Sequence, residues 1–88
     1  MELSKLRDYI DHVDRTIAGL LNERARLVRE IGLLKKDLGI EIYQPDREKE
    51  VLNRVRSIGE QGFLGPNAME SVFERVIEVC RNLEGEER

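Results

Sequence analysis

Two cations in the sequence are spaced so that both can lie on one face of a helix, where they could bind an anion. Arg24 interrupts a series of apolar residues that otherwise recurs every three or four positions, and Lys35 follows it eleven residues later. At 100° per residue, the two side chains lie only about 20° apart around a helix and about 16 Å apart along it. Five basic residues and one acid lie between Arg24 and Lys36, so the local field attracts anions although the chain carries a net charge of −3. A polar residue that sets helix register is the alternative interpretation of Arg24.

The other polar residues offer little for covalent chemistry. Cys80 lies on an apolar stripe, where a free thiol usually acts as a small hydrophobic residue, and the sole histidine, His12, is far from it in sequence. One cysteine and one histidine cannot form a Cys/His zinc site, and the chain has no phosphate-binding glycine loop or serine triad. Arg47 and Glu48 are, on composition alone, ordinary first-turn residues. The cations and the few carboxylates therefore suit the binding of a small polyanion, without a metal or cofactor.

One long helix is predicted to carry both cations. Apolar residues from Leu3 to Leu38 recur with an average spacing of about 3.5, which is the coiled-coil period. These seam residues are Leu3, Leu6, Ile10, Val13, Ile17, Leu20, Leu27, Ile31, Leu34 and Leu38. The 36 helical residues would span about 54 Å, whereas a globule of this size is roughly 30 Å across, so the helix must project from its own monomer. A second copy of the helix can cover the exposed seam, which predicts an intertwined two-fold homodimer.

Two shorter helices are predicted to follow. Pro45 suits a first helical turn and Gly59 a C-cap, which indicates a second helix over about 45–58. An apolar stripe with helical spacing predicts a third helix over about 66–84, followed by a solvated tail. Residues 39–44 are expected to form a loop, because an isolated strand would have nothing to pair with. The predicted fold class is all-α, with residues 1–88 forming a single domain.

Composition limits the classes of function. Hydrophobic residues make up 40% of the chain and charged residues 38%, which excludes the low-hydrophobicity signature of disorder. The negative net charge disfavours nucleic acid as a partner. No apolar run approaches the ~18 residues of a membrane span, and the N-terminus lacks the apolar core of a signal peptide. With a single cysteine, the chain is expected to work in the reducing cytoplasm and to bind no membrane.

Several short motifs at matching spacings resemble the all-helical chorismate mutases. The motifs are Leu6-Arg7, Ile10-Asp11, Val13-Asp14, Leu20-Leu21, Arg24, Ile31-Gly32, Lys35, Pro45-Asp46-Arg47-Glu48, Val72-Phe73 and Val76-Ile77-Glu78. The resemblance covers essentially the whole chain. It implies a cofactor-free rearrangement of the dicarboxylate chorismate to prephenate, in the biosynthesis of phenylalanine and tyrosine. A pericyclic step of this kind needs no nucleophile, in agreement with the residues found above.

The resemblance also implies roles for individual residues. Arg7 and Arg24 resemble the two arginines that bind the substrate carboxylates, and Lys35 resembles the cation that hydrogen-bonds the ether oxygen. Glu48 resembles the acceptor for the ring hydroxyl, and Arg47 the neighbouring arginine that braces the pocket. Arg7, Arg24 and Lys35 thus belong to the expected catalytic set, together with one further residue of the third helix.

Three positions depart from the commonest pattern of that family. Glu84, the remaining member of the catalytic set, stands where the second ether-oxygen donor is usually a Gln, so it must be protonated to donate and should make activity depend on pH. Cys80 stands where several members carry a small hydroxyl residue, and its thiol is a weaker donor to a substrate carboxylate. Gln44 stands where an Asp is frequent, which leaves a backbone contact as its expected role.

The separation of the two arginines favours a site shared between chains. Arg7 and Arg24 are seventeen residues apart, about 25 Å along a straight helix, which one small substrate cannot bridge. In an antiparallel dimer, Arg7 of one chain can reach the pocket around Arg24 of the other, and the family arrangement resembles this.

Two other functions remain as alternatives. An isochorismate-pyruvate lyase uses a similar site on the same fold, and a non-catalytic helical dimerisation or regulatory module would also explain the heptads. The module leaves Arg24, Lys35 and Glu48 unexplained, and the fuller match of cations favours the mutase. Residues 78–84 resemble the junction at which a mutase domain continues into prephenate dehydratase, so the chain is expected to be either a free-standing enzyme or such a domain.

Overall fold

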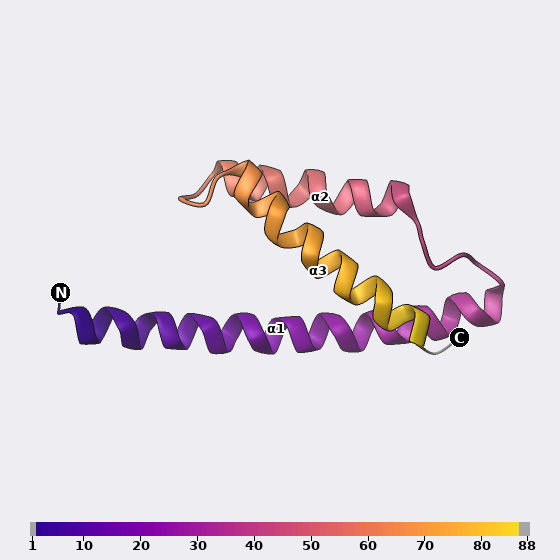
Figure 1. Cartoon of the computed structure of the whole chain (residues 1–88), viewed down its shortest axis with the longest axis horizontal. Coiled ribbons are helices and arrows are strands. Elements are labelled where there is room, and N and C mark those ends of the chain that lie inside the picture. The colour runs from indigo at the N-terminus through magenta and orange to yellow at the C-terminus, as the bar shows by residue number, and fades with distance from the viewer. Residues whose placement is uncertain (1, 87–88) are drawn as a thin grey trace.

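Three helices make up the fold in the computed structural model, which describes residues 2–86. They are α1 (Leu3–Leu38), α2 (Pro45–Glu60) and α3 (Pro66–Glu86), and Figure 1 shows α1 running the whole length of the molecule. The molecule measures 54 × 23 × 13 Å, so its length is that of α1. The predicted all-α class, with one long helix and two shorter ones, is confirmed. Within residues 2–86, no helix is long and apolar enough to span a membrane.

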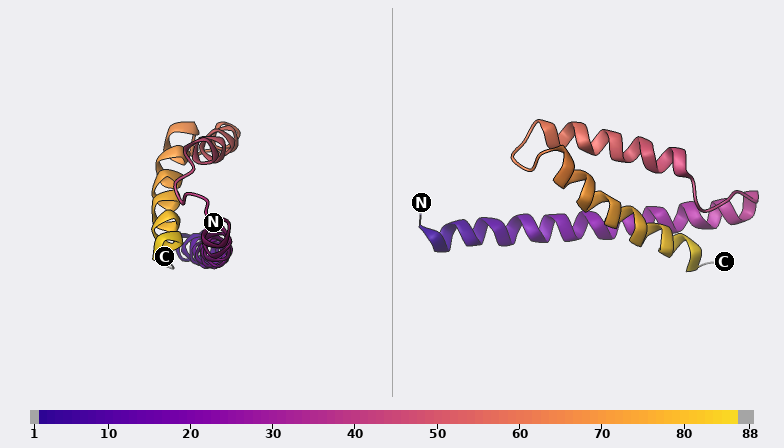
Figure 2. Two further views of the ribbon diagram at one scale, coloured as in Figure 1. Left: turned by 90° about the vertical axis from the view of Figure 1, so that its right-hand side faces the viewer. Right: turned by 45° about the horizontal axis from the view of Figure 1, so that its top comes forward.

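Helix α3 joins the other two helices. It packs against α2 and against α1, whereas α1 and α2 make no contact with each other in the described part of the chain. In Figures 1 and 2, α3 runs diagonally from the end of α2 to the C-terminal part of α1. The shared core is correspondingly small, and its buried hydrophobic residues are Val28, Val55, Ile77 and Cys80. The space between α1 and the beginning of α2 is therefore set by how α3 docks on each of them.

Two buried glycines allow the closest approaches between segments. A Cβ atom at Gly32 would lie 3.0 Å from the Cα atom of Glu84 and 3.1 Å from its carbonyl oxygen, so α3 rests directly on the α1 backbone there. A Cβ atom at Gly59 would collide with the carbonyl oxygen of Gly65. Gly19, by contrast, has nothing within 4 Å of its Cβ position. Of the two glycines in the long helix, only Gly32 is thus required by a close contact within the chain.

Some predicted boundaries are confirmed and others are wrong by about two residues. Helix α1 has the predicted extent, and Gly39 follows it in the left-handed conformation with φ of 69°. Residues 39–44 form no helix or strand, as expected of a loop.

The predicted ends of the second and third helices were too early. Helix α2 does not stop at Gly59: it continues to Glu60 and is capped by Gln61, because Gly59 packs inside the helix against the following turn. Helix α3 includes Gly85 and Glu86, which were predicted to lie in a tail. The last two residues of that predicted tail, 87 and 88, lie outside the described residues.

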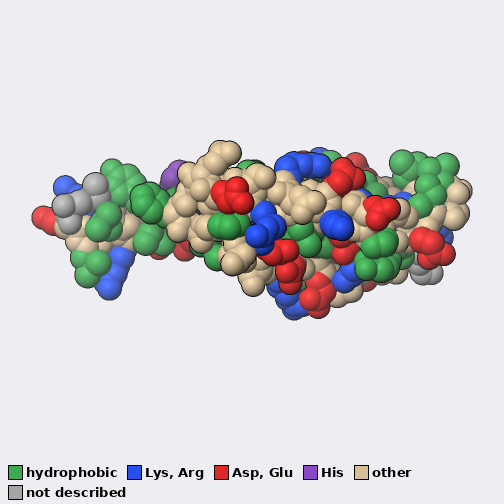
Figure 3. Space-filling view, turned by 90° about the horizontal axis from the view of Figure 1, so that it is seen from above, with side chains coloured by type: hydrophobic (Ala, Val, Ile, Leu, Met, Phe, Trp, Pro, Cys, Tyr) green, Lys and Arg blue, Asp and Glu red, His purple; other side chains and the backbone are tan. Residues whose placement is uncertain are grey.

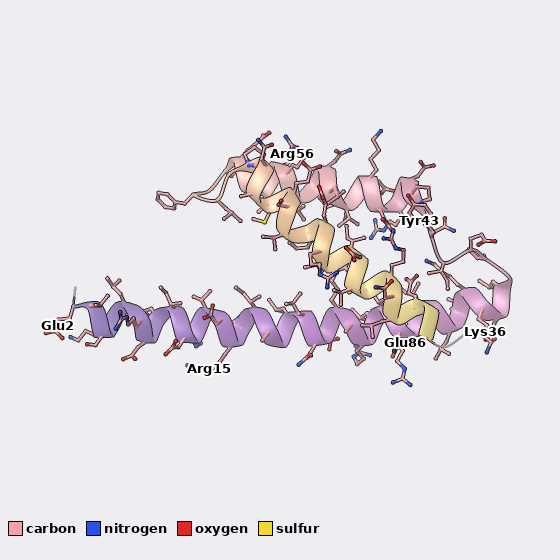
Figure 4. All side chains as sticks on the ribbon, in the orientation of Figure 1. Glu2, Arg15, Lys36, Tyr43, Arg56 and Glu86 are labelled. Carbon is pink, nitrogen blue, oxygen red and sulfur yellow. The ribbon has the colours of Figure 1, made fainter. Side chains whose placement is uncertain are left out.

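The apolar seam of α1 is left uncovered. Its residues are between 44% and 65% exposed, with Leu27 and Leu20 at the two limits. Helix α3 instead covers Val28 and Gly32, each one position after a seam residue and so about 100° around the helix. Figure 3 shows apolar side chains on the surface of the projecting end of α1, and Figure 4 shows side chains there, Arg15 among them, with no other helix alongside. The predicted projection of α1 from its own monomer is confirmed.

Substitution Gly32→Ala tests the close packing of α3 on α1. Alanine gains about 1 kcal/mol of helix propensity, but overpacking against the Glu84 backbone typically costs about 1–3 kcal/mol. We expect a lower melting temperature for Gly32→Ala and an unchanged or higher one for the matched variant Gly19→Ala, measured by circular dichroism at equal protein concentration. Equal shifts for the two variants would contradict the packing described here.

Candidate active site

A pocket of about 390 Å³ lies where α1, α3 and the 39–44 loop meet the beginning of α2. Its apolar wall comes from Val28, Ile31, Ile40, Ile42, Val51 and Ile77. Its polar lining comes from Arg24, Lys35, Gln44, Arg47, Glu48, Cys80, Arg81 and Glu84. A pocket of this size, with an apolar wall and polar groups that converge on it, is typical of a small-molecule site.

Two of the residues that line the pocket, Lys35 and Glu84, form an ion pair. The Lys35 ammonium donates to Glu84 Oε2 at 3.1 Å and to the carbonyl oxygen of Ile42 at 3.0 Å. The two side chains are only 17% and 11% exposed. The Lys35 ammonium therefore connects α1 to α3 and to the 39–44 loop. Removal of either partner of the ion pair would leave a poorly hydrated charge on the other.

A second polar cluster lies at the start of α2. Both carboxylate oxygens of Glu48 accept hydrogen bonds from Arg81 Nη1 at 3.0 Å. The Arg81 guanidinium also lies over the Tyr43 ring, 5.0 Å from its centroid. No role was predicted for Arg81 from the sequence. Its position next to Cys80 and three residues before Glu84 was the available signal, because that spacing places it at the edge of the same face of α3.

The structure brings seven of the eight predicted site residues to this pocket. They are Arg24, Lys35, Gln44, Arg47, Glu48, Cys80 and Glu84. The eighth, Arg7, is exposed near the start of α1, about 25 Å along the helix from Arg24. Arg24 and Lys35 line the same pocket, as their angular spacing on one helix predicts.

The seven residues differ in how they are held. Cys80 is a free, buried thiol, and Arg24 is half-buried. The Gln44 side chain donates to the carbonyl oxygen of Glu41 at 2.9 Å. Arg47 is exposed and pairs with Glu50 on its own helix at 3.6 Å. Its predicted role of bracing the pocket stays a prediction.

The remaining basic stretch of α1 includes side chains directed into solvent. Arg26 pairs with Glu23 and with Glu30 on its own helix, and all three side chains are more than half exposed. The hydrogen bond from Arg26 lowers the pKa of Glu23 below its ordinary value. Arg26 is absent from the pocket lining, and the cations that do line the pocket are Arg24, Lys35, Arg47 and Arg81.

The arrangement of charges defines what the pocket can bind. Cations on α1 can hold anionic groups, while the Glu48 carboxylate on α2 can accept a hydrogen bond from a hydroxyl. The apolar wall can contact a ring or another apolar body. Fold and pocket together thus describe a small helical domain with a pocket suited to an anionic, hydroxylated ligand.

Comparison with known proteins gives the family. The chorismate mutase type II profile matches residues 6–85, and the chain belongs to that family. Form II of the chorismate mutase from Thermus thermophilus has the same fold, with a TM-score of 0.90, 35% sequence identity, and coverage of 94% of this chain and 93% of that one. The prediction of an all-helical chorismate mutase domain is confirmed.

Relatives of two lengths are similar to this chain. The chorismate mutase of Methanocaldococcus jannaschii is 32% identical over 77 residues, which cover 88% of this chain and 78% of that protein. The bifunctional chorismate mutase/prephenate dehydratase of Aquifex aeolicus is 34% identical over 86 residues, or 94% of this chain. The chain spans 24% of that protein's length, and 20% of the T-protein of Enterobacter agglomerans, to which it is 41% identical.

The buried ion pair generates a prediction about stability. Lys35→Met leaves the Glu84 carboxylate without its cation, and we expect a loss of about 1–3 kcal/mol. The double variant Lys35→Met/Glu84→Gln should recover part of this loss, because the uncompensated charge is removed. Urea unfolding of Lys35→Met, of Glu84→Gln and of the double variant measures the effect, with Arg75→Met, which breaks an exposed pair with Glu78, as the control. Additive losses in the double variant would show that the pair is not coupled.

Proposed function

We propose that this chain rearranges chorismate to prephenate in the pocket between α1, α3 and the start of α2. The observation that carries the proposal is the convergence of Arg24, Lys35, Glu48 and Glu84 in one pocket of a chorismate mutase fold. In this Claisen rearrangement a carbon–oxygen bond breaks while a carbon–carbon bond forms. The site must therefore hold a dicarboxylate in its reactive conformer and stabilise negative charge on the ether oxygen.

Each polar group of the pocket has a proposed part in that reaction. Arg24 binds a substrate carboxylate, and Lys35 donates to the ether oxygen. Glu84, whose carboxylate lies 3.1 Å from the Lys35 ammonium, becomes the second donor to that oxygen when it takes up a proton. Glu48 accepts a hydrogen bond from the ring hydroxyl. The apolar wall excludes water, which strengthens each of these interactions.

The other pocket residues have proposed roles at its edges. Cys80 lies near a substrate carboxylate as a weak donor, and Gln44 contributes a backbone contact. Arg47, exposed at the rim, adds to the positive field that attracts the dianion.

The proposed active form is an intertwined two-fold homodimer with two shared sites. The uncovered seam of α1 supports it, since apolar side chains exposed to this extent along a whole helix are typical of an interface. The position of Arg7, about 25 Å from Arg24 along the same helix, supports it as well. In the dimer, Arg7 of each chain completes the pocket of the partner by binding the second carboxylate.

The proposed setting is the biosynthesis of aromatic amino acids in the cytoplasm. The names of the relatives support the pathway, and the free thiol of Cys80 suits a reducing compartment. Loss of chorismate, followed spectrophotometrically with the product identified, tests the reaction. Prephenate is the expected product. Release of pyruvate from isochorismate without prephenate would assign the lyase activity instead, and turnover of neither substrate would refute an enzymatic role.

Mixing two inactive variants tests the shared site. Arg7→Ala and Arg24→Ala are each expected to lose nearly all activity. After subunit exchange, half of the dimers in an equal mixture are heterodimers, each with one intact site of two, so about a quarter of wild-type activity should return. Arg15→Ala, an exposed residue of α1 absent from the pocket lining, serves as the control and should stay active. Exchange without any recovery would rule out a site shared in this way.

The pH profile tests Glu84 as a donor. A carboxylic acid donates only while it holds its proton, so activity should fall as pH rises and Glu84 ionises. Glu84→Gln supplies a permanent donor of similar shape, and its activity should decline less at alkaline pH. Turnover and specificity constants across the stable pH range measure the difference. If the two profiles superimpose, Glu84 is not the donor.

A further inference from the structure

Glu48 is held by a residue that lies 33 positions further along the chain. A single nitrogen, Arg81 Nη1, lies 3.0 Å from each of the two carboxylate oxygens of Glu48. The Glu48 and Arg81 side chains are 24% and 34% exposed, so the pair is partly shielded from water. A charge-assisted contact of this kind is roughly twice as strong as a neutral hydrogen bond. It restricts a side chain that would otherwise rotate about several bonds.

The Arg81 side chain is itself held in place. Its guanidinium lies over the ring of Tyr43, 5.0 Å from the centroid, an arrangement that is attractive for a cation. Tyr43 belongs to the 39–44 loop just before α2, as Figure 4 shows. The same loop is fixed by the hydrogen bond from Lys35 to the Ile42 carbonyl. Arg81 thus connects α3 to α2 and to a loop that is itself attached to α1.

The neighbour of Glu48 in sequence does not provide this support. Arg47 is exposed, and its ion pair is with Glu50 at 3.6 Å. Consecutive helical residues point about 100° apart, so Arg47 and Glu48 face different directions. Arg81, from the facing helix, occupies the position from which the carboxylate can be oriented.

We propose that Arg81 is a positioning residue that fixes Glu48 for recognition of the substrate's ring hydroxyl. The inference rests on the proposed function, in which Glu48 accepts that hydrogen bond. A carboxylate has about four acceptor positions, and Arg81 uses two of them. The others stay available to the pocket, and the rigid carboxylate discriminates against ligands that lack the hydroxyl, because its acceptor would then stay unpaired.

The test compares two ligands that differ only in this hydroxyl. The probes are a bicyclic dicarboxylate that mimics the transition state and the same compound without its hydroxyl group. Calorimetry gives the Kd of each for the wild-type protein and for Arg81→Met, which keeps an unbranched aliphatic side chain but removes the guanidinium that contacts Glu48 and Tyr43. We expect the wild type to prefer the hydroxylated ligand by about ten-fold or more, and Arg81→Met to lose most of that preference while its Kd for the deoxy ligand changes little.

Three further variants separate positioning from folding and from direct contact. Arg81→Lys restores a charge and should regain part of the preference for the hydroxylated ligand. If Arg81 only supported the fold, no such recovery would be expected. In the Glu48→Ala background, Arg81→Met should cause no further loss of preference for the hydroxylated ligand. Arg75→Met, on the same helix but outside the pocket, should behave as the wild type.

The outcomes distinguish the two proposals. An equal loss of affinity for both ligands in Arg81→Met would overturn the role of Arg81, since the residue would then bind a carboxylate or only support the fold. The role of Arg81 would also be overturned if Arg81→Met caused its full loss of preference for the hydroxylated ligand in the Glu48→Ala background. Failure of the wild type to bind either diacid or to convert chorismate would instead refute the proposed function, and the role of Arg81 with it.

Discussion

The geometry of the pocket depends on one partly buried ion pair. Lys35 and Glu84 join α1 to α3, and the same ammonium holds the 39–44 loop through the Ile42 carbonyl. Helices α1 and α2 do not contact each other within residues 2–86, so no direct packing keeps them at their separation. Gly32 completes the constraint, because the absence of a side chain there lets the Glu84 backbone rest on α1. The width of the pocket follows from these contacts rather than from a large core.

A small core explains why the monomer leaves so much apolar surface exposed. Among the described residues no side chain is less than 2% exposed. A chain of this size buries only about 60% of its unfolded surface when it folds alone. Burial of the α1 seam in a dimer would supply both the missing apolar contacts and, through Arg7, the missing cation. In the proposed enzyme, folding and assembly of the site would then be the same process.

Periodicity and angular spacing predicted the features that depend on a single helix. The heptads predicted the approximate extent of α1, and the eleven-residue interval predicted that Arg24 and Lys35 face the same way. The convergence of residues from different helices on one pocket was predicted through the family resemblance rather than from spacing. Two other features that depend on contacts between segments were missed. Gly59 is a natural C-cap by its type, but the packing of Gly65 against it keeps it inside α2. The contact between Glu48 and Arg81 has no local signal, because it exists only once α2 and α3 have docked.

The polar groups of the pocket combine fixed positions with unused hydrogen-bonding capacity. An ammonium has three donors, and Lys35 directs them to the Ile42 carbonyl and to both carboxylate oxygens of Glu84. The contact with Glu84 Oε1 is long at 3.4 Å, so its donor is the one that a ligand can take over. The Glu48 carboxylate likewise keeps acceptor positions beyond those that Arg81 uses. Both residues are oriented by protein contacts before any substrate binds, so little reorganisation is needed when charge develops. For a reaction without a nucleophile or cofactor, preorganisation of this kind is the main contribution that side chains can make.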